Sequence, residues 1–394
     1  MIKYFLFASL FPATMFAQSM ELTQQLGKTV LYGDIAISPD AQHVAWVQST
    51  AATTMKEIYL SGTSDKAAAT KVNLGPSGTR KDFAPAWSPD SKKLIFFSTA
   101  GEKEDQRQLW MANADGSGAK KITSLKGYAA RPRWSRDGTQ IAFLYIEGGG
   151  GGGPLVATQN ATGIIDTAFH NQRIAVIDAK GGQPRQVSPA DLHIYDYDWS
   201  PDGRSFVVTA AAGPGDNNWW IAQIHTIDIA KGTATAIHKP ALQVAVPRWS
   251  PNGKSIAFIE GIMSDEGNHG GDLWTMAADG SGLTNRTKGR KSSPGSVFWL
   301  EPDRIRFSEA VGGSDAMSEL NVTDNAVTTI WKGDQEIAGS GNFANFAVAR
   351  DGKVSAFVRS DYSTPPEVWI GPTGNWRQLT RNNSSLSPNW GRAE

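Results

Sequence analysis

The sequence contains no cysteine, no surplus of charge of either sign and only one long apolar run, which lies at its N-terminus. The absence of cysteine from 394 residues excludes disulfides, thiol nucleophiles and thiolate metal sites. Basic and acidic residues balance at 38 each, so the net charge gives no reason to expect nucleic acid as a partner. The chain also lacks a P-loop, a dinucleotide fingerprint, a complete G-x-S-x-G motif and metal-ligand spacing among its histidines. We therefore expect no catalytic residue, cofactor or metal site in this chain.

The apolar run extends from Tyr4 to Phe16, after a single lysine. It is too short to anchor a chain stably in a bilayer and fits a secretory signal peptide at 1–17, cleaved after Ala17. No other stretch approaches the roughly 18 apolar residues of a membrane helix. These features predict a periplasmic or secreted protein with no membrane contact after signal cleavage. The alternative is an N-terminal segment buried within the fold.

A tryptophan-centred motif recurs along the chain. It reads PAWSPDSKKLIFF at 85–97, PRWSRDGTQIAFL at 132–144, YDYDWSPDGRSFVVT at 195–209 and PRWSPNGKSIAFI at 247–259. More degenerate copies bring the number of anchor positions to seven, at a period near 50 residues, and such a period indicates a repeat array. The anchors are Ile37, Trp87, Trp134, Trp199, Trp249, Trp299 and Val348.

Each copy predicts four short strands. The Ser-Pro-Asp-Gly segment suits a type I turn between two apolar strands, and a second hairpin follows, as at 108–123 and 272–287. Seven such units predict an all-β fold, a seven-bladed β-propeller over 33–381, after a lead-in at 18–32. A linear solenoid is the less favoured alternative. Because no strand is left over at either end, we expect packing between the first and last blades to close the ring.

The repeated residues themselves have structural explanations. We expect the tryptophans to pack between neighbouring blades and the turn aspartates to accept local backbone hydrogen bonds rather than bind metal. These aspartates are Asp40, Asp90, Asp137, Asp202 and Asp351. Asp196 and Asp198 alternate just before Trp199 and are expected to line the central channel.

The second turn of every blade should emerge on one face of the ring, and this turn is long in the third, fourth and fifth copies, at 147–171, 211–223 and 260–272. Function on rigid scaffolds concentrates in such loops. Carboxylates beside an aromatic surface can hold a cationic group such as a peptide amine, or a divalent cation. If 216–220 is extended, its two tryptophans point to opposite sides and one is exposed. The simpler interpretation is that one of the two tryptophans packs in the core and that the acidic side chains of these loops are solvated. The candidate substrate-binding residues are Asp216, Asn217, Asn218, Trp219, Trp220, Asp265 and Glu266.

The WSPDG repeats resemble those of TolB-like proteins and of the N-terminal propeller of prolyl oligopeptidase family (S9) serine peptidases. Four segments resemble the peptidases more closely, especially bacterial exported enzymes of the acylaminoacyl-peptidase and dipeptidyl-peptidase type. They are SPADLHIYDYDWSPDG at 188–203, GDNNWWIAQIHTID at 215–228, PRWSPNGKSIAFIEGIMSDEG at 247–267 and PPEVWIGPTGNWRQLT at 365–380.

The resemblance implies a propeller that gates access and positions peptide substrates for a C-terminal α/β-hydrolase domain carrying a Ser-Asp-His triad. Residues 382–394 resemble the start of the linker to that domain, which this chain lacks, so no triad residue is carried over. The chain's own status as an enzyme stays open. The alternative is a free-standing TolB-like periplasmic propeller that binds protein or peptide. The TolB-like pattern, a separate α/β domain before six blades, fits seven blades less well.

Overall fold

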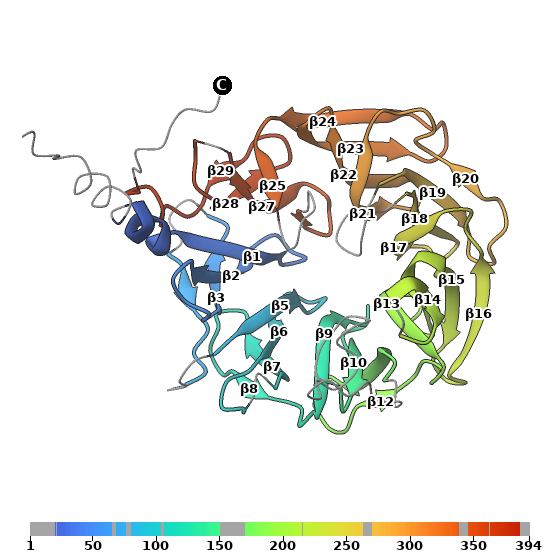
Figure 1. Ribbon diagram of the computed structural model, residues 1–394, viewed down its shortest axis with the longest axis horizontal. Coiled ribbons are helices and arrows are strands. Elements are labelled where there is room, and N and C mark those ends of the chain that lie inside the picture. Colours follow the sequence, from blue (N-terminus) through green and yellow to red (C-terminus); the bar gives the residue numbers. More distant parts are fainter. Residues whose placement is uncertain are drawn as a thin grey trace, which may run out of the picture.

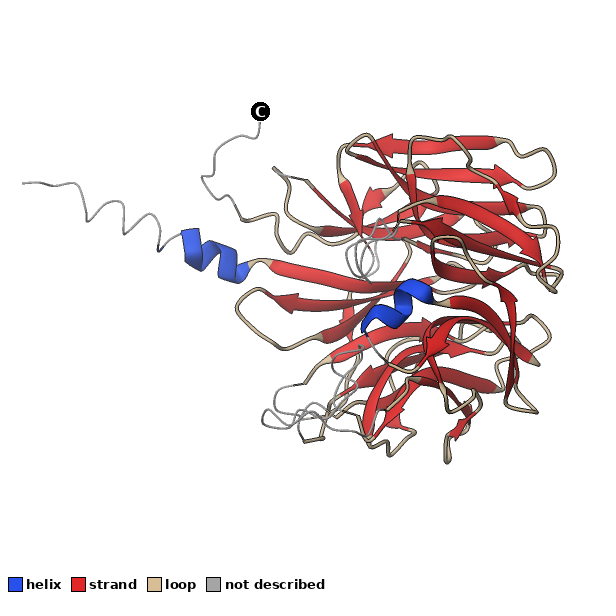
Figure 2. Cartoon of the chain, turned by 45° about the vertical axis from the view of Figure 1, so that its right-hand side comes forward, coloured by secondary structure: helices blue, strands red, loops and turns tan. Residues whose placement is uncertain are grey.

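The computed structural model is a ring of seven β-sheets around a central axis (Figure 1). It describes residue 20 and residues 22–64, 68–75, 80–103, 106–149, 170–214, 216–262, 270–338, 346–361 and 363–386. Residues 22–28 are helical and lie outside the ring, and a 3-10 helix, η1 (Asp216–Ile221), lies among the strands (Figure 2). No helix in the described part of the chain is long and apolar enough to cross a membrane.

The blades follow one another in chain order, and within each the strands run antiparallel from the axis outward. Blade 1 contains β1 (Val30–Ile37), β2 (His43–Thr50), β3 (Glu57–Gly62) and β4 (Thr70–Lys71); blade 2 contains β5 (Asp82–Trp87), β6 (Lys93–Ser98), β7 (Gln108–Asn113) and β8 (Lys120–Lys121). Blade 3 contains β9 (Gly127–Trp134), β10 (Gln140–Glu147), β11 (Arg173–Asp178) and β12 (Arg185–Gln186); blade 4 contains β13 (Leu192–Trp199), β14 (Ser205–Ala212), β15 (Gln223–Asp228) and β16 (Thr233–His238).

Blade 5 contains β17 (Gln243–Trp249), β18 (Ser255–Gly261), β19 (Asp272–Ala277) and β20 (Thr284–Asn285); blade 6 contains β21 (Ser293–Glu301), β22 (Arg304–Val311), β23 (Ser314–Asn321) and β24 (Val327–Gly333). In blade 7 two short segments, β25 (Glu336–Ala338) and β26 (Ala347–Val348), both pair with β27 (Val354–Ser360), followed by β28 (Glu367–Pro372) and β29 (Arg377–Gln378). The predicted seven-bladed, four-stranded propeller is confirmed, and the linear alternative is excluded.

The tryptophan anchors join each blade to the one before it. In four blades the indole Nε1 of the anchor donates a hydrogen bond to the preceding blade. The acceptor is the carbonyl of the residue just before the anchor of that blade. The pairs are Trp87 with Ala36 at 3.1 Å, Trp134 with Ala86 at 3.1 Å, Trp199 with Arg133 at 3.3 Å and Trp299 with Arg248 at 3.1 Å. Trp249 departs from the pattern, because its buried Nε1 has no acceptor among the described residues. The predicted packing role of the anchors is confirmed.

Each turn aspartate accepts hydrogen bonds from residues of its own turn. In blade 4 the Ser200 hydroxyl donates to Asp202 Oδ1 at 2.6 Å, and the backbone N–H of Arg204 donates to the same oxygen at 3.1 Å. The residue after the aspartate, Gly203, has a φ of +69°, a left-handed conformation that glycine adopts without strain. Equivalent contacts to a backbone N–H occur at Asp40, Asp90, Asp137 and Asp351. The prediction of a local, structural role is confirmed.

Side chains and packing, not a shared strand, close the ring between blades 1 and 7. Among the described residues, β1–β4 and the strands of blade 7 form separate sheets. The Asn383 side chain accepts the Val30 backbone N–H at 2.8 Å and donates to the Val30 carbonyl at 2.9 Å. Tyr32 donates to Glu367 at 2.8 Å across the same seam. Apolar residues of both blades, including Trp46 and Val368, pack into one cluster beneath these bonds.

Candidate functional site

A channel of about 720 Å³ runs along the axis, lined by the innermost strands of all seven blades. In blades 1 to 6 the innermost strand carries a β-bulge close to its anchor residue. A bulge re-aims a side chain, and the residue three positions before the anchor faces the channel in each of these blades. These residues are Asp34, Ala84, Arg131, Asp196, Val246 and Ser296. Asp34, Ala84, Arg131 and Val246 have φ between 45° and 55°, so these four blades share the same local backbone geometry at this position.

Apart from Asp34 on blade 1, the acidic and basic residues that line the channel gather on blades 3 to 5. The position immediately before the anchor is alanine in blades 1, 2 and 7 and phenylalanine in blade 6, but it is Arg133, Asp198 and Arg248 in blades 3, 4 and 5. Blades 3 and 4 also carry Arg131 and Asp196 three positions before their anchors. Blades 3 to 5 are also those with the long second turns. The backbone is therefore similar from blade to blade, whereas the side chains that face the channel differ in charge.

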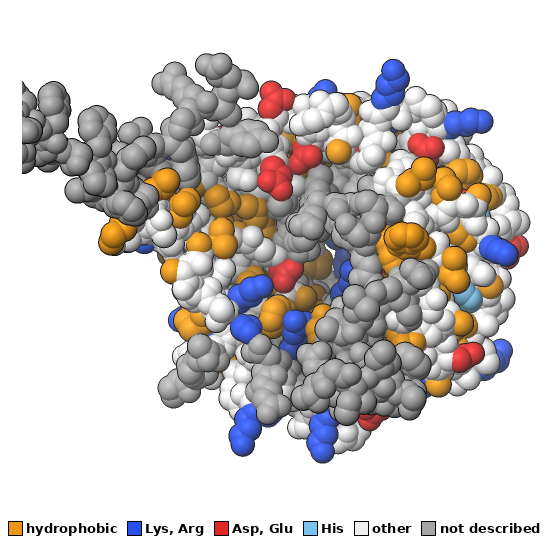
Figure 3. All heavy atoms as spheres, viewed as in Figure 1, with side chains coloured by type: hydrophobic (Ala, Val, Ile, Leu, Met, Phe, Trp, Pro, Cys, Tyr) orange, Lys and Arg blue, Asp and Glu red, His pale blue; other side chains and the backbone are white. Residues whose placement is uncertain are grey.

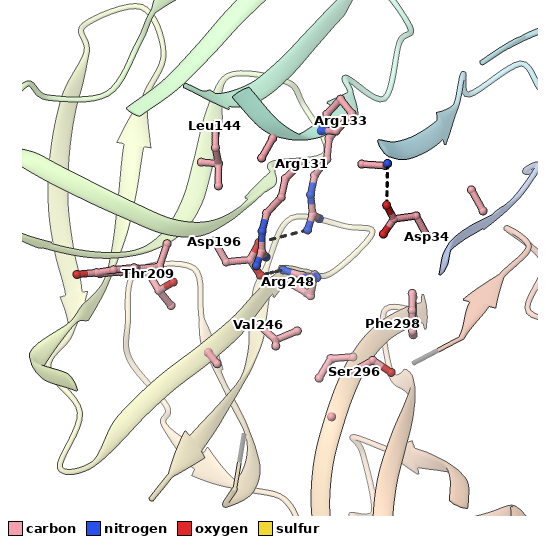
Figure 4. Close-up of a pocket in the computed structure, with 18 of the residues that line it drawn as sticks. Asp34, Arg131, Arg133, Leu144, Asp196, Thr209, Val246, Arg248, Ser296 and Phe298 are labelled. Carbon is pink, nitrogen blue, oxygen red and sulfur yellow. Dashed lines mark hydrogen bonds and ion pairs between the residues drawn. The ribbon is translucent and has the colours of Figure 1, made fainter. Parts of the chain in front are cut away.

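Three arginines converge on the carboxylate of Asp196 (Figure 4). Arg131 and Arg133 approach Oδ1 at 3.3 Å each, and Arg248 approaches Oδ2 at 2.8 Å. The backbone N–H of Tyr197 also donates to Oδ1, at 2.9 Å. Burial alone would raise the pKa of Asp196, but the three guanidinium groups outweigh burial and hold this pKa far below its ordinary value.

Asp198 lies behind Asp196. Its Oδ1 binds Arg133 at 3.2 Å, and its Oδ2 accepts the backbone N–H of Trp249 at 3.0 Å. Burial raises the pKa of Asp198 despite the neighbouring arginines. The prediction that both aspartates line the channel is confirmed for Asp196 and wrong for Asp198, which is not among the lining residues. Asp198 instead supports Arg133 and ties blade 4 to blade 5.

Further cations surround Asp34 toward the face from which the second turns emerge, which we call the loop face. Burial raises the pKa of Asp34, and the charges of Lys56, Arg107 and Arg131 oppose that rise. The Arg107 guanidinium lies over the rings of Phe83 and Tyr128, at 3.9 and 4.5 Å from their centroids. Figure 3 shows Lys and Arg side chains gathered beside hydrophobic ones near the central hollow, over β1, β5 and β9.

His193 also lines the channel wall. It is 1% exposed, and its Nδ1 accepts the backbone N–H of Gln172 at 3.1 Å. Burial lowers the pKa of His193 to about 4. The imidazole is therefore neutral near neutral pH and contributes no charge to the channel.

The predicted 216–220 segment forms a 3-10 helix, so the extended conformation considered for it is wrong. One tryptophan is nevertheless buried and the other exposed. Trp219 is 7% exposed and packs on Ala245 and Val246 at the channel wall, whereas Trp220 is 49% exposed. The Asn218 side chain donates to the Ala212 and Gly213 carbonyls and so fastens η1 to the end of β14. Asp216 and Asn217 begin η1, and their side chains lie outside the described part.

The structure describes only the two ends of the 260–272 loop, so it does not test the candidate residues there. Asp265, Glu266 and His269 lie outside the described residues. Asp272 accepts hydrogen bonds from Asn285 at 2.7 Å and from Thr287 at 3.0 Å, so it holds β19 against β20. Within the described ranges no group of three acidic or histidine side chains could hold a metal ion.

Sequence reasoning missed Arg131, Arg133 and Arg248. A usable signal was present, because Arg133 and Arg248 directly precede their tryptophans in the two PRW copies. Once the tryptophan is assigned to the blade interface, the alternation of a strand places its neighbour toward the axis. The contact between Arg131 and Asp196, 65 positions apart, depends on how two consecutive blades pack and on the bulges, and no local pattern encodes either.

No family model matches the chain. Curated relatives match over short segments. Dipeptidyl-peptidase 5 of Porphyromonas endodontalis is 29% identical over 126 residues, or 31% of this chain and 15% of the relative. The uncharacterised peptidase YuxL of Bacillus subtilis is 24% identical over 150 residues, or 34% of this chain and 22% of the relative. The matched segments thus span less than a quarter of each of these relatives.

Solved structures match over nearly the whole ring. Acylaminoacyl peptidase of Pyrococcus horikoshii gives a TM-score of 0.65 at 15% identity, covering 91% of this chain and 54% of that one. The propeller domain of the Trilobed protease of Pyrococcus furiosus gives 0.62 at 15% identity, covering 90% and 99%. Oligogalacturonate lyase of Vibrio parahaemolyticus gives 0.57 at 13% identity, covering 89% and 85%, so the fold alone does not select a peptidase. The curated relatives are S9 peptidases, and the resemblance of this propeller to S9 propeller domains is confirmed.

Proposed function

We propose that this chain is the propeller domain of an exported S9-type serine peptidase, which gates access and positions peptide substrates for an α/β-hydrolase domain. One combination of observations supports the proposal. The sequence is related to peptidases, and the ring matches about half of acylaminoacyl peptidase but almost all of an isolated protease propeller. The catalytic serine, aspartate and histidine would come from the hydrolase domain. Export rests on the N-terminal apolar run.

The loop face of blades 3 to 5 is the proposed substrate side. The long second turns of these blades leave the ring there, and the arginine cluster around Asp196 is built from the same three blades. Trp220 and Ile221 present apolar surface on this face, being 49% and 70% exposed. The 216–220 and 265–272 loops would hold the N-terminal part of a peptide, with Asp216, Asp265 and Glu266 near its amine. The ring would exclude folded substrates sterically.

We predict that Trp220→Ala, made in the intact peptidase, raises KM for a peptide substrate about three- to tenfold while kcat changes little. An exposed indole side chain contributes equally to the binding free energy of the ground state and of the transition state, so its loss changes KM and not kcat. Glu266→Ala is expected to act in the same direction. The measurement is steady-state kinetics on a fluorogenic peptide.

The matched control is Leu283→Ala. Leu283 is also an exposed apolar residue, at 42%, but it lies in the turn between β19 and β20, on the face opposite η1. This control should leave KM unchanged. Unchanged kinetics for Trp220→Ala and Glu266→Ala would remove the loops from substrate binding. If the native protein works without a hydrolase domain, the propeller is a peptide- or protein-binding scaffold instead.

A further inference from the structure

We infer that the central channel binds a carboxylate group of the peptide, with Arg131 as its exposed contact and Arg133 and Arg248 behind it. This inference rests on the proposed function and adds the chemistry of the substrate at this site. The carboxylate can belong to the peptide C-terminus or to an acidic side chain.

The cluster holds more positive than negative charge. Arg131, Arg133 and Arg248 carry three charges, while Asp196 and Asp198, which pair with them, supply two. Asp34 adds a third acid to the same channel, but Lys56 and Arg107 beside it bring the cations to five against three acids. A guanidinium has five N–H donors in a planar fork that matches a carboxylate. Among the described residues, the only ion pair of Arg131 is the one with Asp196. Within the described part of the chain most of its donors therefore have no partner and can bind a second carboxylate.

The geometry presents the cations, not the aspartates, to an incoming ligand. The side chain of Arg131 is 56% exposed, whereas that of Asp196 is 9% exposed and lies beneath the three guanidinium groups. Both oxygens of Asp196 are already occupied, Oδ1 by Arg131, Arg133 and the Tyr197 N–H, and Oδ2 by Arg248. Asp196 thus holds the arginines in place without neutralising them.

The path from the loop face to this cluster is also cationic. Lys56 and Arg107 lie near Asp34 at the loop-face end, on blades 1 and 2. Stacking on Phe83 and Tyr128 fixes the Arg107 guanidinium, which donates to the Ala129 carbonyl at 3.3 Å. An anion that enters from the loop face meets these cations before it reaches Arg131. Electrostatic attraction of this kind favours entry of acidic ligands.

The walls around the cluster fit the body of a peptide. Leu144, Trp219, Val246, Phe298 and Phe346 line the channel, and Figure 4 shows Leu144, Val246 and Phe298 around the arginine cluster. The volume of about 720 Å³ lies within the roughly 300–1,000 Å³ of typical ligand sites. A few polar groups among apolar walls fix the orientation of a ligand in such sites. An apolar peptide with one carboxylate matches this arrangement.

The test measures peptide binding to the chain by isothermal titration calorimetry at low and high salt. The probes are an apolar pentapeptide with a free C-terminus, its C-terminal amide, and two amidated versions with glutamate or glutamine at the centre. We expect a free carboxylate to strengthen binding about tenfold, the strength of one charge-assisted hydrogen bond, and high salt to reduce this gain. The amidated pair shows whether a side-chain carboxylate serves as well as the C-terminus.

Arg131→Gln should remove most of the gain while leaving the affinity for amidated, neutral peptide unchanged. Arg185→Gln is the matched control, because Arg185 lies on the outer strand β12 and binds the Ile229 carbonyl far from the channel. It should change neither affinity.

The outcomes separate the two proposals. Equal affinity for acidic and neutral peptides in the wild-type chain would overturn the carboxylate site and leave the peptide-binding function standing. Absence of binding for every probe would contradict both. The wild-type comparison needs no variant, so a folding defect in Arg131→Gln cannot obscure the result.

Discussion

Single residues, rather than the repeat, set the chemistry of the channel. The position before the anchor is alanine in three blades, and a bulge in each of blades 1 to 6 aims a side chain at the axis. Substitution of arginine and aspartate at these positions in blades 3 to 5 is enough to build the cluster around Asp196. His193, buried on the same wall, is the residue whose protonation state changes most clearly on folding.

We predict that His193 makes the fold less stable as the pH falls. Its pKa is about 4 in the folded chain against an ordinary value of 6.5, so between these values the unfolded chain binds a proton that the folded chain does not. The free energy of unfolding should therefore fall by about 3 kcal/mol as the pH drops from roughly 6.5 to 4. In His193→Gln this part of the pH dependence should disappear, because glutamine does not titrate. The glutamine oxygen can still accept the Gln172 N–H, so the local structure should be kept.

Urea titrations at a series of pH values provide the measurement. The same change at His225 is a useful comparison, since burial also lowers the pKa of His225. The double variant should have the flattest profile. A His193→Gln profile that runs parallel to wild type would show that His193 is not buried as described.

At the level of elements, the anchor tryptophans offer a matched pair. Trp134 donates its indole N–H to Ala86 at 3.1 Å, whereas the Nε1 of Trp249 has no acceptor among the described residues. Replacement by phenylalanine removes a similar volume at both positions but a hydrogen bond only at the first. We expect Trp134→Phe to lower the free energy of unfolding by about 1–2 kcal/mol more than Trp249→Phe. Thermal or urea unfolding measures the difference. Equal losses would show that the indole bonds do not join the blades.

The elements also show what the sequence can predict. The turn motif and the 50-residue period gave the strands, the blade count and the roles of the anchors, because local turn chemistry and a regular repeat determine them. The 3-10 helix at Trp219 and Trp220 was not predictable from an extended pattern. It depends on Asn218 binding the end of β14 and on Trp219 packing against blade 5. The arginine cluster was missed because its contacts form only between blades.

At the scale of the whole molecule, the seam between blades 1 and 7 is the expected weak point. Asn383 is fully buried and joins Val30 to the Pro366 carbonyl across it. We predict that Asn383→Ala costs about 2–3 kcal/mol, because it leaves buried backbone groups of blade 1 without partners. Hydrogen exchange should then accelerate first in β1 and β27.

Asn382→Ala is the control for this prediction. The Asn382 side chain also contacts blade 1, at Gln48 and Tyr32, but it is exposed to solvent, which can replace these contacts. Its removal should therefore cost much less than that of Asn383. Uniform acceleration over all seven blades in Asn383→Ala would contradict a seam that opens before the rest of the ring.

The central claim is that this ring works as the propeller of a serine peptidase. The most direct measurement treats the native protein with a fluorophosphonate probe, which labels activated serines, and then determines the mass and the labelled site. The account predicts a polypeptide heavier than the 42.4 kDa of this chain, labelled at one serine outside residues 1–394. A native polypeptide no heavier than 42.4 kDa that resists labelling would contradict the account. The channel would then belong to a binding protein.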